Sequence, residues 1–510
     1  MASPKDIANR WPITAALMLA TLMNTLDSTI ANVALPHIQG SVSAAQDQVT
    51  WVLTSYIIAA ALMTPLSGWM ALRIGRRRMF LMSIFGFTVT SMLCGIATSL
   101  PEIVIFRFLQ GIAGASMMPL SQNVMLDIFP PERLPTVMAL WSSAIMVGPI
   151  MGPVLGGWLT ENLTWRWVFY INLPIGILAY LGLYLYMEND EGGQQRPFDF
   201  LGFGALVMFI LGLQLMLDRG PSQDWFSSRE IWIEGAIALV GIWVFTVQTM
   251  TAEHPFFHRD LIKDANFVTT TVFGFFTACL MFSASALLPS MMQGLMGYTA
   301  LQSGNASVTR GLGSLAAFIT IPLLLRRFGP HRVLLVGLSI SVIAYWQMAH
   351  FDLSMTAGPI MLSGLLLGLG SGMMFTPTTT LAYATLSPVH RTEGTIVSTI
   401  ARNLGSAVGI SALSAGVINQ TAVAHAALAG HLDPTDPTLR AGLPAMMVPG
   451  DPSNPASSMM LNGEVTRQAG MIAYDQAFSW VILLVLCMVP MLLILRSPKQ
   501  PAPTSFEAAD

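Results

Sequence analysis

The chain has 510 residues, of which 53% are hydrophobic and only 10% are charged, with a formal net charge of −3. Soluble domains carry roughly 25% charged residues, so this composition excludes an ordinary soluble protein and predicts one that crosses a membrane many times. No cluster of basic and aromatic side chains indicates a nucleic-acid partner, and the three cysteines have neither disulfide nor metal-site spacing.

Apolar windows recur along the whole chain with the length of about 20 residues that a membrane-spanning helix needs. Only helices satisfy their backbone hydrogen bonds in lipid in this way, so we expect about fourteen spans, all of them helical. The windows are 12–35, 50–71, 79–98, 102–125, 136–159, 167–187, 199–217, 230–250, 267–290, 303–325, 333–350, 358–383, 395–418 and 474–495.

Basic residues gather in alternate loops of this predicted bundle. Loops rich in Lys and Arg stay in the cytoplasm, so their distribution predicts that both chain ends are cytoplasmic. The two main clusters are Arg73, Arg76, Arg77 and Arg78, and then Arg326, Arg327 and Arg332.

These two clusters also align with each other. RIGRRRMFL at 73–81 matches RFGPHRVLL at 327–335, at a constant offset of 254 residues. The match predicts two parallel six-helix bundles, 1–187 and 267–510, with two inserted helices and their linkers in 188–266. The alternative is that two cytoplasmic loops carry Arg and Gly independently.

The first span contains a carboxylate, Asp27, within an otherwise apolar segment. A charged Asp deep in the bilayer costs at least about 2.5 kcal/mol, so Asp27 is expected to face a cavity or a partner. Asn24, Ser28 and Asn32 continue the same polar stripe at helical spacing and are candidates for contact with a substrate.

Three arginines, Arg107, Arg310 and Arg402, also fall inside predicted spans. Arg107 and Asp27 are expected at compatible depths, and an adjacent arginine would favour the ionised carboxylate. Arg107 could instead snorkel to the outer surface. Arg310 and Arg402 are candidates for a cavity, where either could pair with Asp27 or with an anionic substrate. Helix packing or contact with lipid phosphate is the alternative for both.

The fifth predicted span has the features of a closely packed or bending helix. Gly148, Gly152 and Gly156 recur every four residues, which predicts a smooth packing face, and Pro149 and Pro153 free backbone carbonyls. Packing without any role in gating remains the alternative.

The basic loop after the second span is a further candidate for gating. Gly68 and Gly75 permit a close helix approach and a tight turn, while Arg73 and Arg76 can bind helix C-termini and anionic lipid. Anchoring by the positive-inside rule alone would explain the same arginines.

The longest segment without an apolar window is 419–473, which the span count places outside. It is expected to form a helix, a Pro-rich loop and a second helix. A loop of this length is uncommon unless it is functional or disordered, so a docking surface and a simple spacer are both open.

Several motifs occur in a specific order along the chain. LDSTIANVALP, GWMALRIGRRR, RFLQGIAGA, GPIMGPVLGGWL and WRWVFYINLPIG are followed by LDRGPSQDWFSSREI at 217–231. Together they resemble the major facilitator superfamily, in its fourteen-span drug:proton antiporter branch, and the last motif narrows the resemblance to EmrB-like multidrug efflux permeases. The resemblance covers nearly the whole chain.

The resemblance implies a proton-driven exporter of hydrophobic or amphipathic compounds in the bacterial inner membrane. It implies that Asp27 and Arg107 couple transport to protons, that the proton gradient supplies the energy without a cofactor, and that the Gly- and Pro-rich fifth span gates. It makes the loop after the second span a latch, although Leu72 stands where the superfamily usually has Asp, which puts the usual ion pair in question. It also implies a periplasmic membrane-fusion adaptor and an outer-membrane channel as partners.

Other functions fit the same sequence features. A proton-coupled exporter or importer of one specific metabolite would have the same fold. A membrane scaffold or sensor would have little use for intramembrane charges. An enzyme is not expected, because no nucleotide loop, metal-ligand spacing or nucleophile–base motif is present.

Overall fold

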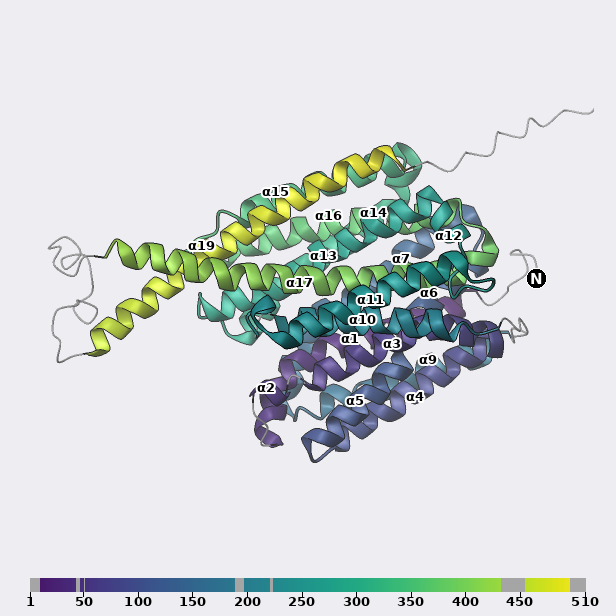
Figure 1. The fold of residues 1–510 in the computed structure, drawn as a ribbon, viewed down its shortest axis with the longest axis horizontal. Coiled ribbons are helices and arrows are strands. Elements are labelled where there is room, and N and C mark those ends of the chain that lie inside the picture. The colour runs from purple at the N-terminus through teal and green to yellow at the C-terminus, as the bar shows by residue number, and fades with distance from the viewer. Residues whose placement is uncertain are drawn as a thin grey trace, which may run out of the picture.

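The computed structural model describes residues 10–42, 46–49, 51–188, 197–220, 223–432 and 455–495. In these ranges every regular element is a helix, and the long helices lie side by side in one elongated bundle (Figure 1). The predicted all-helical membrane fold is therefore confirmed.

The first part of the bundle consists of helices that pack mainly against one another. α1 lies against α7 and α9, while α5 lies against α3 and α4. The helices are α1 (Arg10–Ser41), α2 (Gln46–Val49), α3 (Trp51–Ile74), α4 (Arg76–Ile96), α5 (Leu100–Gly114), α6 (Met117–Ile128), α7 (Leu134–Asn162), α8 (Trp167–Tyr170) and α9 (Asn172–Tyr186).

The last part of the bundle repeats this packing. α13 lies against α17, α14 against α16, and α15 against α16 and α19. The helices are α12 (Asp260–Lys263), α13 (Ala265–Gly294), α14 (Ala300–Phe328), α15 (Pro330–Met348), α16 (Ala357–Ala384), α17 (Arg391–Gly430) and α19 (Pro455–Met488). We call helices α1–α9 the N-terminal half and α12–α19 the C-terminal half.

The sequence offset of the two basic clusters reappears in the helix boundaries. α4 begins at Arg76 and α15 at Pro330, which are 254 residues apart. The residues just before them, Gly75 and Gly329, both have positive φ, 93° and 76°. Glycine takes this conformation without steric strain, so each half makes the same tight turn between two antiparallel helices. The domain limits 1–187, 188–266 and 267–510 stay a prediction.

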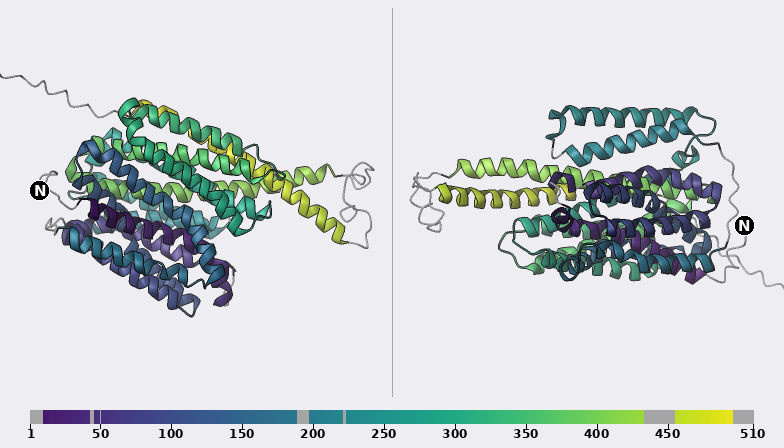
Figure 2. Two further views of the ribbon diagram at one scale, coloured as in Figure 1. Left: turned by 180° about the vertical axis from the view of Figure 1, so that it is seen from behind. Right: turned by 90° about the horizontal axis from the view of Figure 1, so that it is seen from below.

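Two further helices, α10 (Phe200–Arg219) and α11 (Arg229–Thr251), form a hairpin on one side of the bundle (Figure 2). α10 reaches both halves. Thr54 Oγ1 in α3 donates a hydrogen bond to Asp218 Oδ2 over 3.1 Å. Ser411 Oγ in α17 donates to the Leu217 carbonyl over 2.5 Å. The hairpin is therefore tied to the N-terminal and the C-terminal half at the same end of α10.

Each predicted apolar window coincides with one long helix or with two consecutive helices. Twelve of the described helical stretches are long and apolar enough to cross a membrane. α7, with 29 residues, and α15, with 19 residues, pack among them. The chain is a multi-pass membrane protein, while the count of fourteen spans and the cytoplasmic position of both ends stay predictions.

The two helices that flank the predicted outer segment 419–473 are longer than their apolar windows. α17 continues without a break to Gly430, and α19 already begins at Pro455, so both project beyond the other helices (Figure 1). The sequence TAVAHAALAG is rich in Ala, the strongest helix former, which explains why α17 outlasts its hydrophobic stretch. The predicted Pro-rich loop at 433–454 lies outside the described residues.

The two halves meet along a small number of helices. α7 lies against α14 and α16, and α17 lies against α3 and α6. The closest approach includes Gly68 of α3, where a Cβ atom would overlap Cδ1 of Ile396 in α17. Gly68 thus packs against the tip of the Ile396 side chain, and its role in a close helix approach stays a prediction.

Candidate functional site

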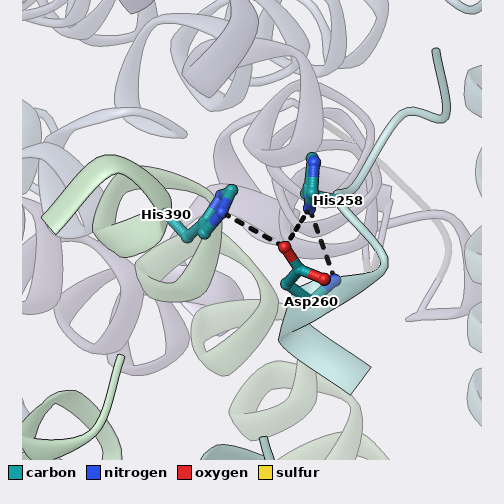
Figure 3. A group of neighbouring side chains, drawn as sticks. All are labelled: His258, Asp260 and His390. Carbon is teal, nitrogen blue, oxygen red and sulfur yellow. Dashed lines mark hydrogen bonds and ion pairs between the residues drawn. The ribbon is translucent and has the colours of Figure 1, made fainter. Parts of the chain in front are cut away.

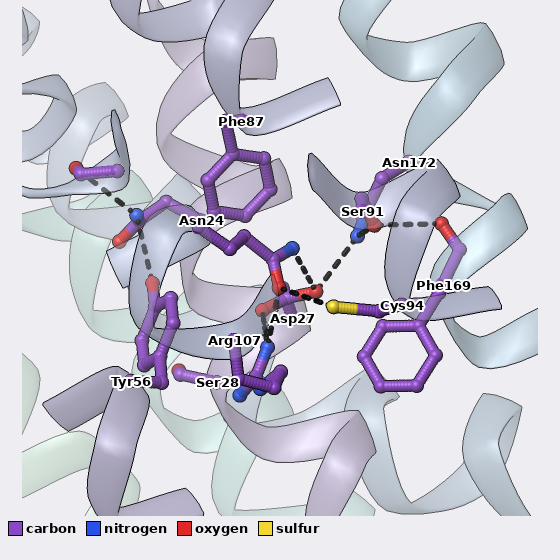
Figure 4. A network of polar contacts seen from close by, with 12 residues as sticks. Asn24, Asp27, Ser28, Tyr56, Phe87, Ser91, Cys94, Arg107, Phe169 and Asn172 are labelled. Carbon is purple, nitrogen blue, oxygen red and sulfur yellow. Dashed lines mark hydrogen bonds and ion pairs between the residues drawn. The ribbon is translucent and has the colours of Figure 1, made fainter. Parts of the chain in front are cut away.

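Asp27 lies inside the N-terminal half, where α1 meets α5 (Figure 4). Nη1 of Arg107 donates to its Oδ2 over 2.6 Å, and the two side chains are 1% and 0% exposed. The sequence predicts that Arg107 and Asp27 lie at compatible depths in the membrane, and the structure places them in contact. Their role in proton coupling stays a prediction.

Two amides complete the surroundings of the carboxylate. Gln110 Nε2 and Asn172 Nδ2 donate to Asp27 Oδ1 over 3.0 and 2.8 Å. Asn172 also donates to Ser91 Oγ over 3.0 Å, which links α9 to α4 (Figure 4). Sequence reasoning missed both amides. Gln110 could have been found, because it lies three residues after Arg107 on the same helix face.

Arg107 is held by three further kinds of contact. Its Nε donates to the Val52 carbonyl over 3.1 Å and its Nη1 to Gln110 Oε1 over 2.8 Å. The guanidinium carbon lies 4.3 Å from the ring centre of Tyr56 and 5.7 Å from that of Phe169. A buried ion pair compensates its desolvation only with good geometry and extra hydrogen bonds, and this site supplies both.

The other polar residues of the α1 stripe do not bond to Asp27. Asn24 Nδ2 donates to Tyr56 Oη and to the Gly114 carbonyl, over 3.2 Å in each case. Ser28 and Asn32 are exposed, and Ser28 Oγ donates to the Thr25 carbonyl of its own helix. Whether any of the three contacts a substrate stays a prediction.

A small cavity of about 20 Å³ lies in the C-terminal half, where α13, α16 and α17 meet. Arg402 is the one charged residue in its lining, and Phe375 of this lining packs against Trp141 of α7 with ring centres 6.3 Å apart. The cavity therefore adjoins the boundary between the halves. Its lining is Thr270, Thr271, Gly274, Thr277, Phe375, Thr378, Thr379, Ala382, Tyr383, Ser398 and Arg402.

Arg310 lines a different cavity, between α13, α14 and α16. Its neighbours there are mainly apolar and include Leu288, Met292 and Ile360. Its Nη1 donates to the Met281 carbonyl over 3.4 Å. Neither Arg310 nor Arg402 lies near enough to Asp27 for an ion pair, so the pairing with Asp27 considered for them is absent from the described residues.

The basic loop after α3 has an acidic partner despite Leu72. Arg76 pairs with Asp127 of α6 and donates to Asn123 Oδ1 over 3.0 Å. Asp127 Oδ1 also lies 3.7 Å from Nη1 of Arg391, at the start of α17. An ion-pair cluster thus connects the two halves at this end. The guanidinium of the loop's other candidate, Arg73, lies 5.0 Å from the ring centre of Trp69.

The glycines of α7 face α1 at close range. A Cβ on Gly148 would lie 2.6 Å from the carbonyl carbon of Thr25, and one on Gly152 would lie 2.9 Å from Cβ of Thr29. Thr29 Oγ1 also donates to the Gly148 carbonyl over 3.1 Å. Gly156 is buried one turn further on. The side chains of Pro149 and Pro153 lie outside the described ones, and the role of these five residues in gating stays a prediction.

A cluster of two histidines and one aspartate joins the segment before α13 to the start of α17 (Figure 3). Asp260 Oδ2 lies 3.3 Å from His258 Nδ1 and 3.9 Å from His390 Nε2. A hydrogen bond from Lys263 lowers the pKa of Asp260. The three groups could offer ligand atoms within 4.8 Å of one another. The two imidazoles stack with their ring centres 4.4 Å apart and an interplanar angle of 29°.

The sequence of residues 17–410, which form most of both halves, matches the Major Facilitator Superfamily. The chain belongs to this superfamily. The multidrug export protein EmrB of Haemophilus influenzae is 36% identical over 473 residues, which cover 91% of this chain and 92% of that protein. The fatty acid resistance protein FarB of Neisseria gonorrhoeae is 33% identical over 500 residues, 97% of each chain. The predicted resemblance to EmrB-like permeases is confirmed.

Solved structures agree on the fold of this major facilitator. The proton:xylose symporter XylE has a TM-score of 0.60 with the chain and covers 95% of it, with 96% of the symporter matched. The identity is 13%, so the match concerns the fold alone. Membership of this superfamily indicates that the chain is a transporter.

Proposed function

We propose that the protein is a proton-driven multidrug exporter of the bacterial inner membrane that works by alternating access. The observation that carries the coupling is the buried ion pair of Asp27 and Arg107, with the carboxylate enclosed by Gln110 and Asn172. An intramembrane carboxylate is costly and marks a functional site by default. The names of the EmrB and FarB relatives support export of toxic amphipathic compounds.

Proton binding acts by removing the negative charge that compensates Arg107. With Asp27 ionised, α1 and α5 are held together by a charge-assisted hydrogen bond of 2.6 Å. Once Asp27 is protonated, Arg107 is left as an uncompensated buried charge, which favours a rearrangement that opens this site. At 100 mV one proton that crosses the membrane supplies about 2.3 kcal/mol. The proton gradient is then the energy source, and no cofactor is needed.

The substrate path follows the boundary between the halves. The cavity with Arg402 adjoins this boundary through Phe375 and Trp141. The two halves are in contact at the end that the distribution of basic residues predicts to be cytoplasmic. There Gly68 packs against Ile396, and Asp127 forms an ion pair with Arg391. The arrangement suits a protein whose halves rock around a site at their interface.

We further propose that the protein is the permease of a tripartite pump. The extended parts of α17 and α19 project from the end opposite the basic loops (Figure 1). His425 Nε2 and Asn462 Oδ1 lie 2.9 Å apart, so the two extensions contact each other away from the bundle. They form the surface that a periplasmic adaptor leading to an outer-membrane channel would bind.

The decisive experiment is transport in sealed vesicles with an imposed pH gradient. Labelled decanoate and the neutral dye Nile red serve as probes. Asp27→Asn and Arg107→Ala are each expected to abolish gradient-driven accumulation of both probes. Asp475→Asn, which changes a carboxylate of α19 outside this network, is the matched control and is expected to keep it. Full gradient-driven transport by Asp27→Asn would refute the coupling.

A proton-coupled carrier of one specific metabolite is the second candidate. The same ion pair would serve it equally well, so the substrate range decides. Competition for transport by several unrelated amphipathic compounds supports the multidrug exporter, while competition by a single compound supports the specific carrier. Inward proton movement coupled to substrate entry would indicate an importer.

A further inference from the structure

We infer that the cavity around Arg402 binds the anionic head group of the substrate, so that the transporter prefers amphipathic carboxylates to neutral or cationic analogues. The inference rests on the proposed function, because it specifies which substrates the exporter takes. It is carried by the charge and the hydrogen-bonding capacity of the cavity.

No carboxylate of the described residues balances the charge of Arg402. Among the described residues Arg402 forms no ion pair, and no acidic side chain lines its cavity. Its Nη2 donates to Thr399 Oγ1 over 3.1 Å, and its guanidinium carbon lies 5.6 Å from the ring centre of Phe375. Asp27 is occupied by Arg107 and two amides. An anion that enters the cavity would pair with this partly exposed cation.

The hydroxyl groups of the cavity fall into two sets. Those of Thr270, Thr277, Thr378 and Thr379 donate to carbonyls of their own helices, so their protons are already used. Such bonds are common for Thr in helices and carry no information about a ligand.

The second set is not bonded to its own helices. The hydroxyl of Thr271 is buried and makes no hydrogen bond to the described residues, while those of Tyr383 and Ser398 are buried next to each other. Tyr383 and Ser398 are 4% and 6% exposed. One hydroxyl of the Tyr383–Ser398 pair can satisfy the other, so at least two of the three protons lack an acceptor, and buried polar groups are nearly always paired. Together with Arg402 these hydroxyls place donors in the wall of the cavity, and donors are what a carboxylate requires.

The position of the cavity fits a transport site. Arg402 lies seven residues into the apolar window 395–418, about 10 Å along the helix, which is about a third of a 30 Å hydrocarbon core. Gly274 lies beside Arg402, since a Cβ there would be in van der Waals contact with Cγ of Arg402 at 3.8 Å. Phe375 and Ala382 give the lining an apolar part.

Equilibrium binding to the full chain in lipid nanodiscs tests the inference. The probes are decanoate, decan-1-ol and decylammonium, which share one tail, and binding to empty nanodiscs is subtracted. The wild type is expected to bind decanoate on the order of tenfold more tightly than decan-1-ol, because a charge-assisted hydrogen bond is worth this much or more. Decylammonium is expected to bind least tightly.

Arg402→Gln is expected to weaken decanoate binding on the order of tenfold to a hundredfold and to leave decan-1-ol binding unchanged. Arg310→Gln is the matched control, since it removes another intramembrane arginine that lines a different cavity, and it should keep the preference. Ser398→Ala and Tyr383→Phe each remove one donor with little change of shape, so each should weaken decanoate binding by a few-fold.

Two results would overturn the inference. One is an unchanged preference for decanoate in Arg402→Gln. The other is an equal loss of decanoate and decan-1-ol binding in Arg402→Gln, Ser398→Ala and Tyr383→Phe, which would show that these residues only maintain the shape of the cavity. No pH gradient is imposed, so a failure of proton coupling would leave this result intact, and a failure here would leave the exporter proposal intact.

Discussion

Arg391 at the start of α17 lies 3.7 Å from Asp127 of α6, so an ion pair joins the two halves of the transporter at the end of the basic loops. Asp127 also pairs with Arg76, and all three side chains are partly exposed. The pair across the halves is present only while this end is closed. Its strength therefore biases the balance between the two access states.

Asp127→Asn is expected to shift the protein toward the state that is open at this end. An exposed pair contributes up to about 1 kcal/mol, which corresponds to about a fivefold change in population. Distances between spin labels on α6 and α17 measure the populations. Glu132→Gln, which removes an exposed carboxylate shortly after the end of α6, is the control. Equal distance distributions for Asp127→Asn and the wild type would contradict the prediction.

Removal of one partner from the buried pair of Asp27 and Arg107 is expected to destabilise the protein more than removal of both. Arg107→Leu leaves an unpaired carboxylate in a site without water access and should cost about 3–5 kcal/mol. The double variant Asp27→Asn with Arg107→Leu should recover part of this loss. Thermal unfolding in detergent measures the loss of stability of each variant. If the losses of the two single variants add up to that of the double variant, the two side chains do not interact.

Gly148→Ala is expected to destabilise the contact of α1 with α7. The new Cβ would lie 2.6 Å from a backbone carbon of Thr25, so one helix must move, at a cost of about 1–3 kcal/mol. Gly157→Ala, in the same helix, adds a Cβ with nothing within 4 Å and should be neutral or slightly stabilising. Similar unfolding temperatures for the two variants would disprove the tight packing at Gly148.

Deletion of the tip of the extensions, residues 423–462, is expected to separate docking from transport. Residues 422 and 463 would be joined by a short flexible linker, and the helical bundle would be unchanged. The variant should still transport substrate in vesicles but should no longer bind the adaptor, as measured by co-purification. Adaptor binding at the wild-type level would exclude these extensions as the docking surface.

The sequence predicted the helices of this protein well, because a span in lipid must be both helical and apolar. The prediction failed where a segment is helical without being apolar. α17 continues to Gly430 although its apolar window ends at 418, since the alanine-rich continuation needs no membrane to be helical. Hydropathy therefore indicates which residues lie in the membrane, and it does not indicate where a helix ends.

The candidate site could be predicted only in part. Asp27 and Arg107 stood out because charges in apolar segments are costly. Gln110 and Asn172 were missed because uncharged amides barely change the hydropathy of a span, and only packing reveals that they meet at Asp27. In the same way, Leu72 made the loop seem to lack an acidic partner, and tertiary structure supplied Asp127 from another helix.

The paired extensions of α17 and α19 have a mechanical consequence. α17 has 40 residues, about 60 Å of helix, so roughly half of it projects past a hydrocarbon core of about 30 Å. In the proposed alternating-access cycle the C-terminal half tilts. The end of the projecting helix would then move further than the helices of the bundle. An adaptor bound to the tip would be displaced in each transport cycle. In the proposed tripartite pump, this displacement could report the state of the permease to the channel without the transfer of a ligand.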